Sequence, residues 1–148
     1  MKSLVLLPLL LFGVLFGFLF GLAAQPPAGT VPKDVETLIR ETADDLTRKD
    51  TSAFLDHFDP KMAGFATLHY EIEGLMARGE VVSVIEIITD AATEKGDYPQ
   101  RELKLDWILS VDTDPRRREV VKVRIEKQGK KWKIVALDPV EFFKPTSP

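Results

Sequence analysis

Two short stretches of the sequence carry the side chains best suited to proton transfer. His57 has an aspartate just before it and another two residues after it, and His69 is followed by Tyr70 and, one helical turn later, by Glu73. A histidine changes charge near neutral pH, so with a carboxylate partner it can act as a general base or acid. His57, His69 and Tyr70 are therefore the candidate catalytic residues. The plainer interpretation is that each histidine lies at the surface beside a carboxylate.

Other chemistries find little support in the residue types. The chain has no cysteine and two histidines, whereas a zinc site needs about three or four converging ligands. The segment Asp112–Asp114 lacks the glycine and the later glutamate of a calcium loop. No serine stands in a nucleophile-elbow sequence, and the chain has no phosphate-loop motif. We expect neither a metal nor a cofactor.

The overall charge gives no indication of nucleic acid as a partner. The 148 residues include 20 basic and 23 acidic side chains, for a formal net charge of −3. Basic runs such as Arg116–Arg118 have acidic residues close by, so they fit solvated turns better than a surface for phosphates. The length suits one ordinary domain.

The first 24 residues form a separate apolar segment. Lys2 is its only charge, and small residues at Gly21 and Ala23 suit cleavage by a signal peptidase. The linker of residues 25–32 is rich in proline, which cannot continue a helix. We expect a cleaved secretory signal; alternatively residues 4–24, long enough to cross a bilayer, remain as an inner-membrane anchor. Either way residues 33–144 form an extracytoplasmic domain, secreted or periplasmic, with membrane contact only through residues 4–24.

Three amphipathic stretches predict three helices after the linker. The first begins with Asp34 as its cap and continues for about four turns. The second spans Ser52–Phe58 and ends before a proline, and the third spans Ala66–Arg78. The charged face of the first helix is expected in solvent: Lys33, Glu36, Arg40, Glu41, Asp44, Asp45 and Arg48.

From Glu80 onward the apolar residues alternate with polar ones, as they do in strands. Arg101–Val111 is the clearest case, because Leu105 and Trp107 point to one face while Asp106 points to the other. The segment containing Lys95–Asp97 is expected to connect two strands, and Asp114-Pro115 is expected in a turn. The strands predicted in this way are Val81–Thr89, Arg101–Val111, Glu119–Lys127 and Lys131–Leu137.

The inward face of the predicted sheet has no side chain that can transfer a proton. It is expected to include Ala136 and an apolar wall that could line a pocket, namely Leu105, Trp107, Val123 and Trp132. The same residues could equally fill the core. A shift of one residue in register would bring Asp106 inward and reverse the argument against catalysis.

Short connections between the strands make them antiparallel neighbours. The expected fold is therefore α+β, with three N-terminal helices packed on a curved, four-stranded antiparallel sheet. The order of elements, the run Phe54–Pro60, the strand around Trp107 and the closing run Gly129–Leu137 resemble the NTF2-like superfamily, with its SnoaL-like relatives and its cystatin-like cone. The resemblance covers Pro32–Phe143 and implies a cone with an apolar interior.

The superfamily contains both enzymes and non-enzymes, so the resemblance does not decide the function. No position here matches the acid and base residues of its ketosteroid isomerase-like members. We expect a non-catalytic domain that binds a small apolar ligand or a protein partner, with Ile108 and Val135 on the outer sheet face helping a homodimer to form. One alternative is a SnoaL-like or dehydratase-like enzyme that uses a histidine in the cone. Another is a structural dimer anchored in the membrane.

Overall fold

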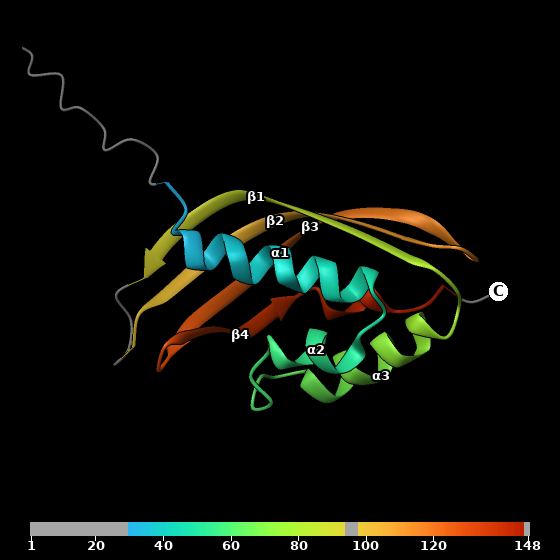
Figure 1. Cartoon of the computed structure of the whole chain (residues 1–148), viewed down its shortest axis with the longest axis horizontal. Coiled ribbons are helices and arrows are strands. Elements are labelled where there is room, and N and C mark those ends of the chain that lie inside the picture. Colours follow the sequence, from blue (N-terminus) through green and yellow to red (C-terminus); the bar gives the residue numbers. More distant parts are fainter. Residues whose placement is uncertain (1–29, 94–97, 147–148) are drawn as a thin grey trace, which may run out of the picture.

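A computed structural model describes residues 30–93 and 98–146 of the chain. Three helices come first and four strands follow, as expected, with a short 3₁₀ helix at the end (Figure 1). The elements are α1 (Lys33–Thr47), α2 (Thr51–Asp56), α3 (Phe65–Met76), β1 (Val81–Thr93), β2 (Gln100–Val111), β3 (Asp114–Gln128), β4 (Lys131–Asp138) and η1 (Val140–Phe143).

The four strands form one antiparallel sheet in the order β1-β2-β3-β4. In its central part Ile85 pairs with Trp107, and Leu105 pairs with Val121. The α+β prediction and the inward face of Arg101–Val111 are confirmed, because Leu103, Leu105, Trp107, Leu109 and Val111 are all buried. Asp106 accordingly lies on the outer face.

The helices cover one face of the sheet and leave the other face open (Figure 1). Helix α1 contacts β1 and α2, while α3 contacts the C-terminal η1. One continuous core fills the space between the two layers, with side chains from all three helices, all four strands and η1. In the part of the chain that the structure describes, the fold thus has a packed interior and one sheet face that the helices leave uncovered.

Strand β3 begins earlier than the sequence predicted. Asp114-Pro115 was expected in a turn, yet β3 starts at Asp114 and the turn is limited to Asp112 and Thr113. The buried carboxylate of Asp114 accepts hydrogen bonds from Arg78 and Arg117, which hold this end in place. Pro115 is tolerated because β4 pairs with β3 only from Lys122 onward, so the strand has an open edge here.

The inward face of β4 also differs from the prediction. Arg124 pairs with Ala136 while Ile125 pairs with Ile134, so Val135 is an extra residue in a β-bulge. Beyond the bulge, the side chains of β4 that were expected to point inward point outward, and the reverse. Leu137 is buried and the expected inward residue, Ala136, lies on the outer face.

The first helix differs from its prediction at both its start and its charged face. Pro32 holds the N-cap position, and Asp34 lies in the first turn without capping the helix. Asp45 was expected in solvent, but it is 5% exposed because it faces α2. Helix α2 ends at Asp56, which leaves His57 in the C-cap position.

Several sequence predictions fall outside the described part of the chain. These are the signal or anchor segment at residues 1–24, most of the linker at residues 25–32, and the connection at Lys95–Asp97. None of the helices within residues 30–146 is long and apolar enough to cross a membrane.

Candidate functional site

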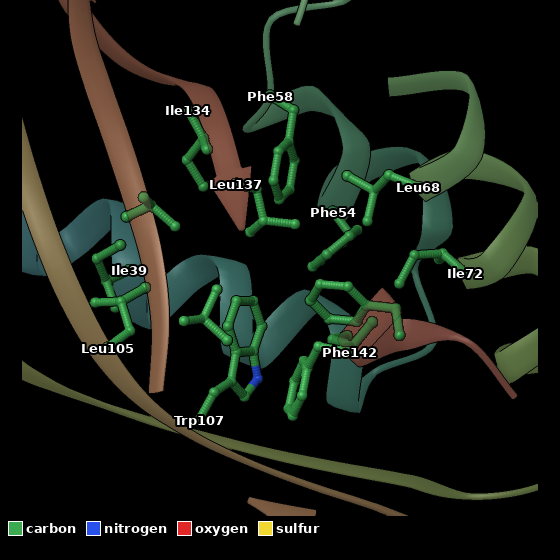
Figure 2. Packing of buried hydrophobic residues seen from close by; sticks show 14 of the residues in the cluster. Ile39, Phe54, Phe58, Leu68, Ile72, Leu105, Trp107, Ile134, Leu137 and Phe142 are labelled. Atoms are coloured by element: carbon green, nitrogen blue, oxygen red, sulfur yellow. The ribbon is translucent and has the colours of Figure 1, made fainter. Parts of the chain in front are cut away.

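The interior between the helices and the sheet is filled by aliphatic and aromatic side chains (Figure 2). Trp107 makes edge-to-face contact with Phe143 at 5.0 Å and lies 5.7 Å from Phe142, both measured between ring centroids. Phe54 lies 5.1 Å from Phe58 and 5.9 Å from Phe143. The C-terminal residues of η1 thus occupy the centre of the cone. An apolar wall is present, and the chain's own side chains cover it.

All four proposed pocket residues belong to this core, with Trp132 at its edge and 9% exposed. Leu105 and Trp107 have no exposed surface, and Val123 is 3% exposed. The polar tip of Trp107 is satisfied internally, because its Nε1 donates a hydrogen bond to Ser83 Oγ over 2.8 Å. A buried indole with a bonded N–H is a stable core arrangement.

The most developed polar site lies in a groove between α1, the end of α2 and the β3–β4 hairpin. The groove has a volume of about 830 Å³, and His57 and Trp132 are among its lining residues. Backbone hydrogen bonds tie the end of α2 to the edge of the sheet: Ile134 N donates to His57 O over 2.8 Å, and Asp59 N donates to Ile134 O over 2.8 Å. The backbone of His57 is therefore held by β4 as well as by its own helix.

The partner of His57 is Asp45, which comes from α1. His57 Nε2 lies 2.7 Å from Asp45 Oδ2, and the Asp45 carboxylate is also paired with Arg48. An ionised carboxylate can only accept, so His57 Nε2 is the donor and Nδ1 is the nitrogen left for a ligand. The side chains of His57 and Asp45 are 16% and 7% exposed. This carboxylate–histidine pair at a groove wall can orient an imidazole for proton transfer.

The fourth pocket residue, Trp132, forms the other wall of the groove. Trp132 Nε1 donates to Asp34 Oδ2 over 2.8 Å, and Lys127 Nζ lies 5.6 Å from the centre of the Trp132 ring. The hydrogen bond from Trp132 lowers the pKa of Asp34, with a further contribution from Lys127. Asp34 is thus an ionised acceptor that fixes the indole.

The second histidine site predicted from the sequence lies on the open surface of α3. His69 Nε2 is 3.1 Å from Glu73 Oε1, and the two side chains are 48% and 64% exposed. Tyr70 is 74% exposed. These residues face neither the core nor the groove of His57, so the structure does not bring the candidate residues together into one site.

Sequence reasoning missed Asp45 because it assigned the aspartates next to His57 as its partners. Asp56 is exposed, and Asp59 is a surface residue whose carboxylate accepts hydrogen bonds from Lys61 N and Gln128 Nε2. The one available signal was the period of α1, which places residue 45 three residues after the apolar-face residue Thr42.

Two further features concern charge. Among residues 30–93 and 98–146, no three His, Cys, Asp or Glu side chains converge as metal ligands would. On the outer sheet face Arg118 binds Asp106 through both Nε and Nη2, at 2.9 and 2.5 Å. The hydrogen bond from Arg118 lowers the pKa of Asp106, which holds this carboxylate ionised and away from the cone.

The outer sheet face also carries an apolar patch, formed by Val82, Val84, Ile108 and Val120. The three valines are about half exposed, and Val84 lies directly opposite Ile108 on the neighbouring strand. Val120 is opposite Asp106, so it is a diagonal neighbour of Ile108. We call this set the apolar patch below.

Comparison with solved structures identifies the architecture. The chain superposes on an NTF2-like protein of unknown function from Shewanella oneidensis MR-1 with a TM-score of 0.52 and 15% identity, over 70% of this chain and 93% of the other. A Nostoc punctiforme protein of unknown function with a cystatin-like fold gives a TM-score of 0.51 and 15% identity, over 72% and 90%. The chain has an NTF2-like fold.

The similarity to these solved structures shows the fold of the chain but not its function. A structure from Bdellovibrio bacteriovorus gives a TM-score of 0.58 at 13% identity and covers 77% of this chain, which spans 40% of that protein's length. No protein-family model matches the sequence. No curated protein matches it either. The function of this NTF2-like domain therefore has to be argued from its own surface and core.

Proposed function

We propose that the chain is an extracytoplasmic NTF2-like domain that functions by binding through its outer sheet face, where it forms a homodimer, and that it carries out no reaction in the cone. The apolar patch is the observation that carries this proposal. Val82, Val84 and Val120 are 54%, 53% and 49% exposed on a face that none of the helices α1, α2 and α3 covers. Contiguous exposed apolar side chains with a polar rim are typical of interaction surfaces.

The filled core favours a surface role over binding inside the cone. Trp107, Phe142 and Phe143 occupy the region where a ligand would need space, and each is at most 3% exposed. A small apolar ligand would have to displace these aromatic contacts. A protein partner at the open face requires no such change.

A second copy of the chain suits this face because the polar rim carries both signs of charge. Glu86 on β1 and Arg118 on β3 lie on opposite sides of the patch, each opposite a residue of β2. A two-fold axis through the patch exchanges the two sides. The acid of one copy can then approach the base of the other, while the valines pack together.

The test measures the mass of the protein in solution for three forms. Sedimentation equilibrium of the wild type should give a dimer, and Val84→Lys should give a monomer because it places charges at the centre of the interface. Tyr70→Lys is the matched control, since it changes an exposed apolar residue on α3, away from the sheet. A monomeric wild type at about 100 µM, or a Val84→Lys variant that remains dimeric, would overturn the dimer.

The extracytoplasmic location rests on residues 1–24, whose apolar run follows a single lysine. Fractionation of the native host, followed by intact mass measurement, tests it. We expect the chain outside the cytoplasm and without its first residues. Recovery in the membrane fraction with residues 4–24 retained would favour the anchored structural dimer, and recovery in the cytoplasm would contradict both interpretations.

A second candidate function is favoured by the pair of Asp45 and His57. The 2.7 Å contact fixes an imidazole at the wall of a groove, as an acid–base enzyme requires. Incubation of a host metabolite extract with wild type, His57→Gln and the control His69→Gln tests this function. An enzyme of this kind should consume a compound in the wild type and the control only. If all three proteins leave the extract unchanged, this candidate is rejected.

A further inference from the structure

A second hollow lies on the outer sheet face, on the far side of the sheet from the core. It has a volume of about 390 Å³ and takes outward-facing residues from all four strands. Lys104 on β2 lines it, whereas Ile108 of the apolar patch is about 13 Å further along the same strand, from the rise per residue of a β-strand. We call it the outer groove. It is separate from the groove that contains His57.

Three cations meet in the outer groove. Lys104 and Lys122 are direct partners across β2 and β3, and Arg124 follows on the same face. Like charges placed directly opposite one another in a sheet repel and are destabilising. On β3, Lys104 has Lys122 opposite it and Val120 and Arg124 at the diagonals, so the facing strand offers it no acid.

Within the described residues, no carboxylate lies within 4.0 Å of the Lys104, Lys122 or Arg124 side-chain nitrogens. Arg118, on the same face, shows the contrast, since Asp106 binds it at 2.5 Å. Two acids, Glu102 and Asp138, also line the outer groove and stand opposite Arg124 and Lys122 in the register, but neither forms an ion pair with these cations. The cations in the outer groove are thus left available to an anion.

Two β-bulges shape the outer groove. In β1 the register shifts between Ile87 and Thr89, so Thr89 and Ala91 face outward while Asp90 turns inward. Asp90 is then 2% exposed at its side chain and pairs with Arg101 at 2.7 Å. Without the bulge, simple alternation along β1 would place Asp90 on the outer face, beside the cations.

The bulge in β4 has the corresponding effect on the opposite side. It places Ala136 on the outer face, next to Arg124, and turns the larger Leu137 into the core. The outer groove therefore has small side chains on both flanks and loses one acid. Bulges are common beside functional sites because they redirect side chains in this way.

We propose that the outer groove binds a small organic anion through a phosphate or carboxylate group. The anionic oxygens lie between Lys104 and Lys122, and the guanidinium of Arg124 offers the two parallel N–H donors that suit such groups. The apolar part of the ligand lies against Ala91 and Ala136. This inference does not depend on the proposed dimer, whose apolar patch lies further along the sheet.

The test follows thermal unfolding of the full chain with inorganic phosphate or succinate as the probe and sodium chloride at matched ionic strength as the reference. A bound anion should raise the Tm of the wild type by about 3–8 °C at about 10 mM, and chloride should not. The variants are Lys104→Gln and Lys122→Gln. Lys49→Gln is the matched control, since Lys49 is an exposed lysine outside the sheet.

The expected signature has two parts. Without an added anion, Lys104→Gln should melt about 1–4 °C above the wild type, because the repulsion from Lys122 is removed and no acid lies directly opposite Lys104 on β1 or β3. With the probe, both groove variants should lose at least half of the wild-type shift, whereas Lys49→Gln should keep it. A response to phosphate alone or to succinate alone identifies the group that the site prefers.

Other results overturn the proposal. Equal shifts in the wild type, the groove variants and the control would mean general charge screening, and no shift in any protein would mean no site. Sedimentation of the same samples separates this proposal from the dimer. If Lys104→Gln and Lys122→Gln dissociate the dimer and the probe has no effect, the cations serve the interface and the anion site is rejected.

Discussion

Asp45 Oδ2 and His57 Nε2 lie 2.7 Å apart although the two residues are separated by twelve positions in the sequence. The contact joins the buried face of α1 to the end of α2. Because Asp45 also pairs with Arg48, its carboxylate has two donors in a nearly closed site. The pair therefore fixes how the two helices pack, whether or not the imidazole transfers a proton.

Replacement of Asp45 by alanine should lower the free energy of unfolding by about 1–3 kcal/mol, because the His57 donor loses its acceptor in a site with little access to water. Chemical denaturation of the variant measures the loss. His69→Ala is the matched control, since its pair with Glu73 is exposed, and it should change stability by less than about 0.5 kcal/mol. Equal losses of unfolding free energy in the two variants would show that the buried pair contributes no more to stability than the exposed pair does.

Phe143 is the central aromatic residue of the core, in contact with Trp107, Phe54 and Phe142. Phe143→Ala should lower the free energy of unfolding by about 3–5 kcal/mol, through lost burial and the cavity left behind. Urea denaturation gives the value, with Tyr70→Ala as the exposed aromatic control. A loss below about 1 kcal/mol would mean that η1 contributes little to the core.

Asp114 should contribute to the acid sensitivity of the fold. Burial acts to raise the pKa of its carboxyl, but hydrogen bonds from Thr146 and Arg78 outweigh burial, so the pKa is lowered. The unfolded chain then binds protons more readily than the folded one below about pH 4. Stability from this group is complete above the unfolded pKa and is lost as the pH falls through the folded pKa.

Asp114→Asn should therefore flatten the acid limb of a plot of unfolding free energy against pH between about pH 4 and pH 2. Asp34, Asp59 and Asp106 also have lowered pKa values, so some acid dependence should remain in the variant. If the unfolding free energies of the variant and the wild type fall equally as the pH decreases, Asp114 is not one of the titrating groups.

Two glycines with positive φ should differ in their tolerance of a side chain. Gly79 has φ +139°, and a Cβ there would lie 2.9 Å from Asp112, whereas Gly129 has φ +65° and open space. Gly79→Ala should cost about 1–3 kcal/mol, and Gly129→Asn should cost less than about 0.5 kcal/mol because asparagine tolerates this backbone region. Thermal unfolding of both variants tests which substitution is more destabilising, and a larger loss for Gly129→Asn would contradict the geometry.

The sequence by itself determined the class and the order of the elements. In Arg101–Val111 the period of two residues is unbroken, so the inward and outward faces follow from strand geometry alone. The same holds for the apolar stripe of α1, which includes Val35, Leu38, Ile39 and Leu46. These features are local, because each residue's direction depends only on its neighbours in the chain.

Only the tertiary structure decided the features that depend on distant partners. The bulges in β1 and β4 reverse the alternation, so Asp90 and Leu137 turn inward and Ala136 turns outward. A bulge depends on how two strands pair, and the pattern of one strand does not contain that information.

The candidate sites show the same division. The sequence identified His57 from its chemistry but paired it with adjacent aspartates, while the fold supplies Asp45 from another helix. The sequence likewise identified an apolar wall of the cone, but in the structure the side chains of the C-terminal η1 fill the cone. Residue type and local period are properties of the chain, whereas burial and the choice of partner arise when distant segments pack together.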